Sequence, residues 1–317
     1  MHNVKARPDS VGGADRRVRH RLGAHLSIAG GVHCALIQAR KLRCDAVQIF
    51  VKNQRQWEAP PLRAADIERW HELRQKWRFG PTIAHASYLI NLAAPRRTLA
   101  LRSRRALANE LLRCDVLAIP YLVVHPGSTA GRPRREAVVR VADSLNAVFA
   151  RYPRLSTQLL LETTAGQGTA LGATPEELAE IVARVEAAER VGVCADTCHV
   201  FVAGYDLRTV EGYCEWVELC ARTVGLARVR CWHLNDSRHE CGTRVDRHAH
   251  IGDGCLGRAA FAHLLGDPRF LHVPMILETP KGTDRRGQDM DRVNLRRLRE
   301  IERRLAGAPH VGPAGVE

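Results

Sequence analysis

Short apolar runs rich in β-branched residues recur eight times along this chain, and patterns typical of amphipathic helices separate them. Strands that alternate with helices indicate successive βα units on a parallel sheet. Eight such units predict an α/β fold of the (β/α)8 TIM barrel type, formed as a single domain. An open doubly wound sheet is the alternative, but it usually carries a glycine-rich phosphate loop after its first strand, and none follows the first run here. We expect strands at 22–25, 46–50, 82–85, 121–125, 158–162, 191–196, 229–233 and 274–278.

The helical patterns have one clear start signal. Thr174 precedes Pro175, and threonine is a good N-cap while proline is favoured at the first helical position. The barrel is expected to span 21–304, with a basic N-terminal extension at 1–20 and a C-terminal tail at 305–317. Both ends lack apolar periodicity, so we expect them to be disordered. Helices are expected near 32–43, 64–77, 97–117, 134–150, 174–188, 207–225, 257–266 and 291–304.

Composition indicates where in the cell the protein is located and which residue types could bind a metal. The N-terminus lacks the apolar region of a secretory signal, and no run is long enough to span a membrane, so we expect a cytoplasmic protein. The ten cysteines are scattered through apolar segments without a CxxC pair, which favours buried free thiols over disulfides or a zinc knuckle. Any metal ligands are therefore expected among His, Asp and Glu.

The net charge of +14, from 48 Lys and Arg against 34 Asp and Glu, favours association with a polyanion such as nucleic acid. Arginine-rich helix faces could supply much of this excess without any partner. Charge therefore permits nucleic-acid binding but does not establish it.

Six of the eight predicted strands end in, or one residue from, a potential metal ligand. The C-terminal ends of barrel strands form one mouth, where enzymes of this fold build their active sites. Apolar strands that end in unpaired buried charges cost free energy unless cations neutralise them. Histidine and carboxylate ligands without thiolates fit a catalytic zinc, manganese or iron site. These residues are His85, His125, Glu162, Asp196, His233 and Glu278, and His25 is a further candidate at the end of the first strand.

Two loops add further candidate ligands. The segment DTCH places His199 just beyond Asp196, and RVDRHAHIGDG contains Asp246, His248 and His250. One ion could not bind so many groups, so two or three ions are implied. Clusters of ions are the usual means of hydrolysing phosphate esters.

Eight segments resemble, in order and spacing, the endonuclease IV family of DNA-repair enzymes, and the resemblance runs from about Leu22 to Arg304. Each motif alone is weak, but eight in order are specific. The segments are SYLINLA at 87–93, HPGS at 125–128, ETTAGQG at 162–168, GVCADTCH at 192–199, AGYDLRT at 203–209, HLND at 233–236, RVDRH at 244–248 and ILET at 276–279.

The resemblance implies three zinc ions per chain, with Glu162 and Glu278 as the candidate catalytic carboxylates. His250 lies outside the implied ligand set. The implied ligands are His85, His125 and Glu162 for the first ion, Glu162, Asp196, His233 and Glu278 for the second, and His199, Asp246 and His248 for the third.

The resemblance also assigns DNA contacts to two loops. Arg55 and Gln56 in NQRQW match groups that enter the minor groove, and Tyr88 and Leu89 match side chains that fill the duplex when an abasic nucleotide is extruded. From the residues alone, NQRQW would instead be a polar surface loop with Trp57 anchored in the core.

The implied activity is zinc-dependent hydrolysis of the phosphodiester 5′ to an abasic site in duplex DNA, which leaves a 3′-hydroxyl and a 5′-deoxyribose phosphate. We expect a monomer that needs no protein partner. A metal-dependent sugar isomerase with a similar barrel is the main alternative, and a lesion-binding protein whose metals only shape a pocket is another. Fold analogy alone does not separate them.

Overall fold

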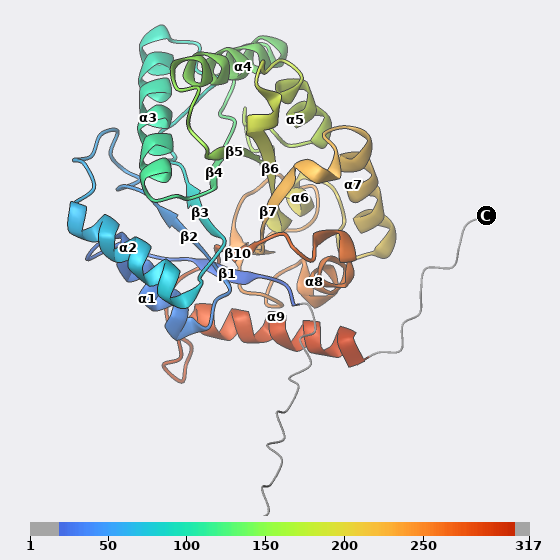
Figure 1. Ribbon diagram of the computed structural model, residues 1–317. Helices are drawn as coiled ribbons and strands as arrows, with labels where there is room; N and C mark the ends of the chain where they lie inside the picture. The colour runs from blue at the N-terminus through green and yellow to red at the C-terminus, as the bar shows by residue number, and fades with distance from the viewer. Residues whose placement is uncertain (1–18, 308–317) are drawn as a thin grey trace, which may run out of the picture.

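The eight apolar runs form a closed parallel barrel in the computed structural model, which describes residues 19–307. The strands follow one another around the barrel in the order β1-β10-β7-β6-β5-β4-β3-β2, and the helices form a ring outside them (Figure 1). This confirms the predicted (β/α)8 fold. The extensions predicted at the two ends fall almost entirely on residues 1–18 and 308–317, which lie outside the described residues.

Six of the barrel strands have the bounds that the sequence predicts, and the other two are shorter. Strand β4 ends one residue before His125, and β10 ends one residue before Glu278, so both ligand candidates begin the loops that follow. The strands are β1 (Leu22–His25), β2 (Ala46–Phe50), β3 (Thr82–His85), β4 (Tyr121–Val124), β5 (Gln158–Glu162), β6 (Val191–Asp196), β7 (Val229–His233) and β10 (Met275–Leu277).

The predicted helix at 174–188 is too long. Its start is confirmed, because the Thr174 side chain accepts a hydrogen bond from the Glu177 backbone N–H at 3.3 Å and Pro175 is the first helical residue. The helix α5 (Pro175–Val182) then ends, and tighter turns bury Val185 before the chain returns to β6. Packing against the barrel therefore overrides the helix-forming residues that follow Val182.

The other predicted helices are confirmed to within about three residues at each end. They are α1 (Val32–Leu42), α2 (Ala64–Trp77), α3 (Arg97–Val116), α4 (Arg134–Arg151), α7 (Val210–Arg222), α8 (Gly257–Gly266) and α9 (Met290–Gly307).

Two layers of side chains fill the barrel interior, because every second residue of a strand points inward. An inner apolar layer forms a cluster separate from the main core between strands and helices. Two residues after each of these seven apolar positions, at the end of the strand or just beyond it, lies a polar side chain, and we call this second set the mouth layer. The inner apolar layer consists of Ala46, Ile83, Val123, Leu160, Cys194, Cys231 and Ile276, and the mouth layer consists of Gln48, His85, His125, Glu162, Asp196, His233 and Glu278.

At the end of the barrel opposite the mouth, the residues before β1 contact α9, which is part of the outer ring of helices (Figure 1). The His20 backbone N–H donates to Glu302 Oε1 at 2.8 Å, and Arg299 Nη1 lies 3.0 Å from Glu302 Oε2. His20 is buried and Arg19 Nη2 lies 3.4 Å from Asp45 Oδ1, so contacts with the barrel begin two residues before its predicted start at residue 21. Within residues 19–307, no helix is long and apolar enough to cross a membrane.

Candidate metal centre at the barrel mouth

Glu162 lies at the centre of the mouth layer and is fully buried. Its carboxylate faces imidazole nitrogens from three other strands or the loops that follow them. Glu162 Oε2 lies 3.1 Å from His85 Nε2 and 3.2 Å from His125 Nε2, and Glu162 Oε1 lies 2.8 Å from His233 Nδ1. One carboxylate thus has a histidine partner on each oxygen, which is the arrangement needed to bridge two sites.

All nine residues of the implied ligand set meet at this mouth. The potential ligand atoms of His85, His125 and Glu162 lie within 4.8 Å of one another, as do those of Glu162, Asp196, His233 and Glu278. The remaining three are joined through Asp246, whose oxygens lie 3.2 Å from His199 Nε2 and 3.2 Å from His248 Nε2. Two of the three implied ligand sets are therefore compact groups that share Glu162. Around the third, the compact groups are Asp196 with His199 and His248, and Cys198 with Asp246 and His248, so the assignment of ligands to a third ion stays a prediction.

Hydrogen bonds to the backbone decide which imidazole nitrogens can bind a cation. The Nδ1–H of His85 donates to the Ala86 carbonyl at 2.7 Å, that of His199 to the Thr163 carbonyl at 2.8 Å, and that of His248 to the Glu278 carbonyl at 3.2 Å. Each bond leaves the Nε2 lone pair directed at a carboxylate. Two lone pairs repel at this distance unless a proton or a cation lies between them, and second ring nitrogens tied in this way are typical of metal ligands.

The pKa values of the histidines and of Glu162 also indicate that the site favours positive charge. Burial alone would lower the pKa of His199, but the Asp196 charge and the Asp246 hydrogen bond raise it to about 10. Burial also opposes the charge of His248, yet the carboxylates of Asp196 and Asp246 raise its pKa to about 9. Burial alone would raise the pKa of Glu162, but the charges of His125 and His233 hold it well below its ordinary value. The ionised carboxylates therefore favour positive charge beside them, supplied either by a proton on histidine or by a cation.

A short helix that the sequence analysis missed places two candidates. Helix α6 (Thr197–Ala203) begins at Asp196, whose side chain caps it by accepting from the His199 N–H at 3.0 Å. The other oxygen of Asp196 accepts from Asn235 Nδ2 at 2.6 Å. Aspartate is a favoured N-cap, so the motif DTCH contained the signal, but seven residues are too few for a visible helical period.

A small hairpin, also missed, holds the RVDRH segment near the mouth. Strands β8 (Asp236–Ser237) and β9 (His248–Ala249) pair antiparallel, with Ser237 opposite His248. The Asp236 carboxylate accepts backbone N–H bonds from Gly252 at 2.8 Å and Leu256 at 2.9 Å. The hairpin thus fixes His248, whereas His250 turns away and contacts Asn294.

Gln48 is a member of the mouth layer that the sequence analysis did not select. Its Oε1 accepts from His233 Nε2 at 2.9 Å, and its Nε2 donates to Glu278 Oε1 at 2.5 Å. It therefore directs His233 Nδ1 toward the carboxylates. His25 lies beside it, 3.1 Å from Glu278 Oε1, and so contacts a ligand candidate without joining the cluster of ligand atoms. A polar residue within the apolar strand AVQIF was the available signal for Gln48.

The residues assigned to DNA lie on exposed loops. Tyr88 is 61% exposed, although its ring centroid is 5.5 Å from that of His85 and 6.1 Å from that of His125. Leu89 is half-buried, and Arg55 and Gln56 are exposed. Large aromatic side chains are normally at least half-buried, so an exposed tyrosine at the barrel mouth is available for contact with a ligand.

Other parts of these motifs have structural roles. Trp57 packs against the main core, with the Arg102 guanidinium 4.5 Å from its ring centroid. Asn91 in SYLINLA accepts from the Ser128 N–H at 3.0 Å, which joins this loop to HPGS. Gly127 has a φ of 114°, and an added Cβ would lie 2.2 Å from Asn91 Oδ1, so the close approach requires glycine.

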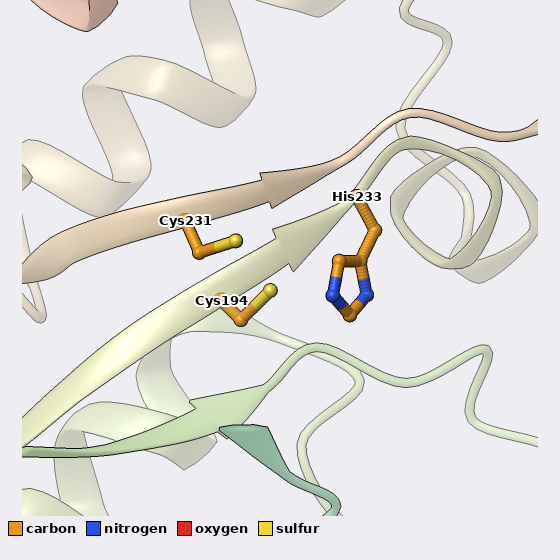
Figure 2. A group of neighbouring side chains, drawn as sticks. All are labelled: Cys194, Cys231 and His233. Atoms are coloured by element: carbon orange, nitrogen blue, oxygen red, sulfur yellow. The ribbon is translucent and has the colours of Figure 1, made fainter. Parts of the chain in front are cut away.

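Two thiols lie directly beneath the centre. Cys194 and Cys231 extend from neighbouring strands on the same side as the His233 ring (Figure 2), and their potential ligand atoms and those of His233 lie within 4.8 Å of one another. Both side chains pack in the inner apolar layer, and burial raises the pKa of Cys194 well above its ordinary value. We interpret them as core residues. All ten cysteines are free, as predicted, but Cys34, Cys214, Cys241 and Cys255 are only half-buried.

Comparison with known proteins gives consistent matches over most of the chain. Residues 36–301 match the family described as Xylose isomerase-like TIM barrel. A protein of Chloroflexus aggregans named "Probable endonuclease 4" is 50% identical over 283 residues, covering 89% of this chain and 98% of that one. The crystal structure of endonuclease IV from Thermus thermophilus is 39% identical, with a TM-score of 0.79, and the match covers 90% of this chain and 99% of that chain.

A D-tagatose 3-epimerase-like protein has a similar structure, with a TM-score of 0.67 over 90% of this chain and all of that chain. Its sequence identity is 19%, so this likeness concerns the fold alone.

Proposed function

This chain belongs to the endonuclease IV family of apurinic/apyrimidinic endonucleases, and we propose that it cuts duplex DNA on the 5′ side of abasic sites with three zinc ions at the barrel mouth. The observation that carries the proposal is the bridging position of Glu162, which has imidazole nitrogens at 2.8–3.2 Å from both of its oxygens. Hydrolysis there would leave a 3′-hydroxyl and a 5′-deoxyribose phosphate.

The donor set fits zinc, which binds imidazole and carboxylate groups and keeps an open position in catalytic sites. His85, His125 and Glu162 would hold one ion. Glu162 would share a second ion with Asp196, His233 and Glu278, and His199, Asp246 and His248 would hold the third. When bound, such ions lower the pKa of water and neutralise charge on phosphate oxygens.

The chain's own groups orient this chemistry. The Ala86 and Thr163 carbonyls fix His85 and His199, and Gln48 fixes His233. The ligand nitrogens are thus held before substrate arrives, which reduces reorganisation during the reaction. Glu162 and Glu278 would act mainly as ligands, and either carboxylate could also accept a proton.

Recognition would come from the loops at the rim. Tyr88 and Leu89 would occupy the space that the extruded abasic nucleotide leaves, and Arg55 and Gln56 would contact the minor groove. An abasic nucleotide has little stacking to lose, so its extrusion is favoured over that of an intact nucleotide.

The decisive experiment is a nicking assay on a duplex with one abasic site, run with and without a chelator. We expect a single cut on the 5′ side, a 3′ end that a polymerase extends, and loss of cutting when the metal is removed. Elemental analysis of protein purified without chelator should give about three transition metals per chain, mainly zinc. Absence of nicking by metal-loaded protein, or about one metal per chain, would contradict the proposal.

The same assay separates the alternatives. A sugar isomerase of this fold would leave the duplex intact, and a lesion-binding protein would retain the abasic duplex without cutting it. A cytoplasmic location, a monomeric state and the absence of a required protein partner stay predictions.

A further inference from the structure

A buried ion pair lies between the two loops to which DNA contacts are assigned. Lys52 follows β2, Glu110 is on α3, and Lys52 Nζ lies 3.0 Å from Glu110 Oε1. Both side chains are only 1% exposed. Neither is a ligand candidate in the mouth cluster, so the centre itself does not account for this pair.

Each partner of the pair also binds the backbone of one loop. Lys52 Nζ donates to the Gln56 carbonyl at 2.6 Å, on the loop that carries Arg55. Glu110 accepts the Ser87 backbone N–H at 3.2–3.3 Å, at the start of the loop that carries Tyr88. The ion pair thus connects the two loops through its own charges.

Ser87 also joins the two loops by a direct hydrogen bond. Its Oγ donates to the Gln54 carbonyl at 2.5 Å and accepts from the Leu89 N–H at 3.3 Å. A chain of hydrogen bonds therefore runs from Gln56 through Lys52, Glu110 and Ser87 to the residue beside Tyr88.

Burying an ion pair is an expensive way to stabilise a fold. Desolvation of the two charges offsets most of their attraction, and apolar residues of similar volume often serve stability as well or better. Charged groups that accept and donate several directed hydrogen bonds do, however, fix geometry in a way that apolar contacts do not.

We propose that Lys52 and Glu110 are positioning residues that set the spacing and orientation of the loops 53–57 and 87–91, so that Arg55 and Tyr88 engage the same abasic site together. This inference rests on the proposed function. It assigns the pair to recognition of the damaged nucleotide and not to metal binding.

The test uses the full chain loaded with zinc and the double substitution Lys52→Met with Glu110→Gln. The two changes remove both charges together, so no unpaired charge is left buried, and the amide oxygen introduced by Glu110→Gln can still accept from the Ser87 N–H. Ser87→Ala is a smaller second variant that removes the direct bond between the loops. Asp267→Asn is the matched control, because Asp267 is also a buried carboxylate but binds Tyr213 and Arg269.

For each protein, kcat and KM are measured on an abasic duplex, and binding is measured on abasic and undamaged duplexes. Fluorescence of 2-aminopurine placed beside the lesion reports unstacking. We expect the double variant to lose about tenfold or more in kcat/KM, mainly through KM, with metal content unchanged and weaker fluorescence on binding. Ser87→Ala should change KM in the same direction by a smaller factor, and Asp267→Asn should leave KM unchanged.

Wild-type KM and wild-type preference for damaged DNA in both Ser87→Ala and the double variant would overturn the inference, as would an equal rise of KM in Asp267→Asn. If the double variant does not fold, Ser87→Ala alone is the test, and wild-type KM with wild-type preference for damaged DNA in that variant would overturn the inference. Failure of the wild-type protein to nick abasic duplex would instead refute the proposed function.

Discussion

Leu160 and Glu162 lie two residues apart on β5, and both side chains are fully buried inside the barrel. Leu160 belongs to the inner apolar layer, where neighbours on other strands are also apolar. Glu162 belongs to the mouth layer, where its neighbours are histidines that need a proton or a cation between them and the carboxylate. Leu160 and Glu162 are therefore equally buried, but their chemical surroundings differ, which predicts that substitutions in the inner apolar layer affect stability and those in the mouth layer affect activity.

Glu162→Gln tests the mouth layer and should have the largest effect. The substitution keeps the shape of the side chain but removes the charge that two cations would share, so nicking should fall by more than about a hundredfold. Circular dichroism should still show a folded barrel. Near wild-type nicking would mean that Glu162 is not part of the active site.

Leu160→Ala is the matched change in the inner apolar layer. Removing a fully buried leucine side chain should lower the free energy of unfolding by about 2–5 kcal/mol, because the remaining cavity is not refilled. Urea denaturation measures this loss, while kcat per folded molecule should stay close to wild type. A loss of zinc or of kcat as large as that in Glu162→Gln would remove the distinction between the layers.

Simultaneous replacement of Tyr88 and Leu89 by alanine should act on recognition alone. Base–aromatic stacking contributes about 1–3 kcal/mol, so binding to abasic duplex should weaken roughly tenfold or more. Zinc content should not change, because neither side chain is a ligand.

An undamaged duplex is the control for that variant. Its affinity rests mainly on phosphate contacts, so it should fall much less and the preference for damaged DNA should shrink. If the double variant keeps its preference, SYLINLA is a structural segment and not a recognition loop.

Glu302→Gln should have the smallest effect, because Glu302 lies on α9 and contacts His20 at the end of the barrel opposite the mouth. Burial opposes ionisation of Glu302, but hydrogen bonds from His20 and Arg299 lower its pKa from 4.5 to about 2. A lowered folded-state pKa adds stability above pH 4.5, and this stability is lost as the pH falls toward 2. The variant should be less stable than wild type by about 1 kcal/mol at pH 7, allowing for partial solvent screening.

Thermal unfolding at several pH values measures this difference. The melting curves of Glu302→Gln and the wild type should converge near pH 2, and nicking at pH 7 should be equal. A difference in stability that grows as the pH falls would contradict the assigned contacts.

The sequence predicted the barrel well because the periodicities of strands and of helices are both visible in the order of apolar residues. Alternation within strands fixed which residues point inward, and helical spacing fixed the connecting elements. Six of the nine ligand candidates followed from strand ends, since parallel strands bring those ends together, and the other three came from the segments DTCH and RVDRH. Periodicity failed where an element was too short to show one, as in α6, or where packing ended a helix early, as after Val182.

Other parts of the site depend on contacts between distant segments. Gln48 looked like an irregularity in an apolar strand, and only the register of the barrel brings it to His233 and Glu278. Lys52 and Glu110 belong to different βα units, and nothing in either segment shows that the two charges meet. Backbone acceptors such as the Ala86 and Thr163 carbonyls leave no mark in the sequence at all.

Because the inner apolar layer and the mouth layer are two residues apart, the barrel should tolerate substitutions better than insertions or deletions. Substitutions within the inner apolar layer alter volume but leave every ligand candidate facing the mouth. Insertion or deletion of one residue between Leu160 and Glu162 would shift the alternation, so the carboxylate would turn toward the helices and its apolar neighbour toward the centre of the barrel. The inner apolar layer should therefore accept point mutations more readily than single-codon insertions or deletions, and length variation in relatives of this chain should be confined to the loops beyond the mouth.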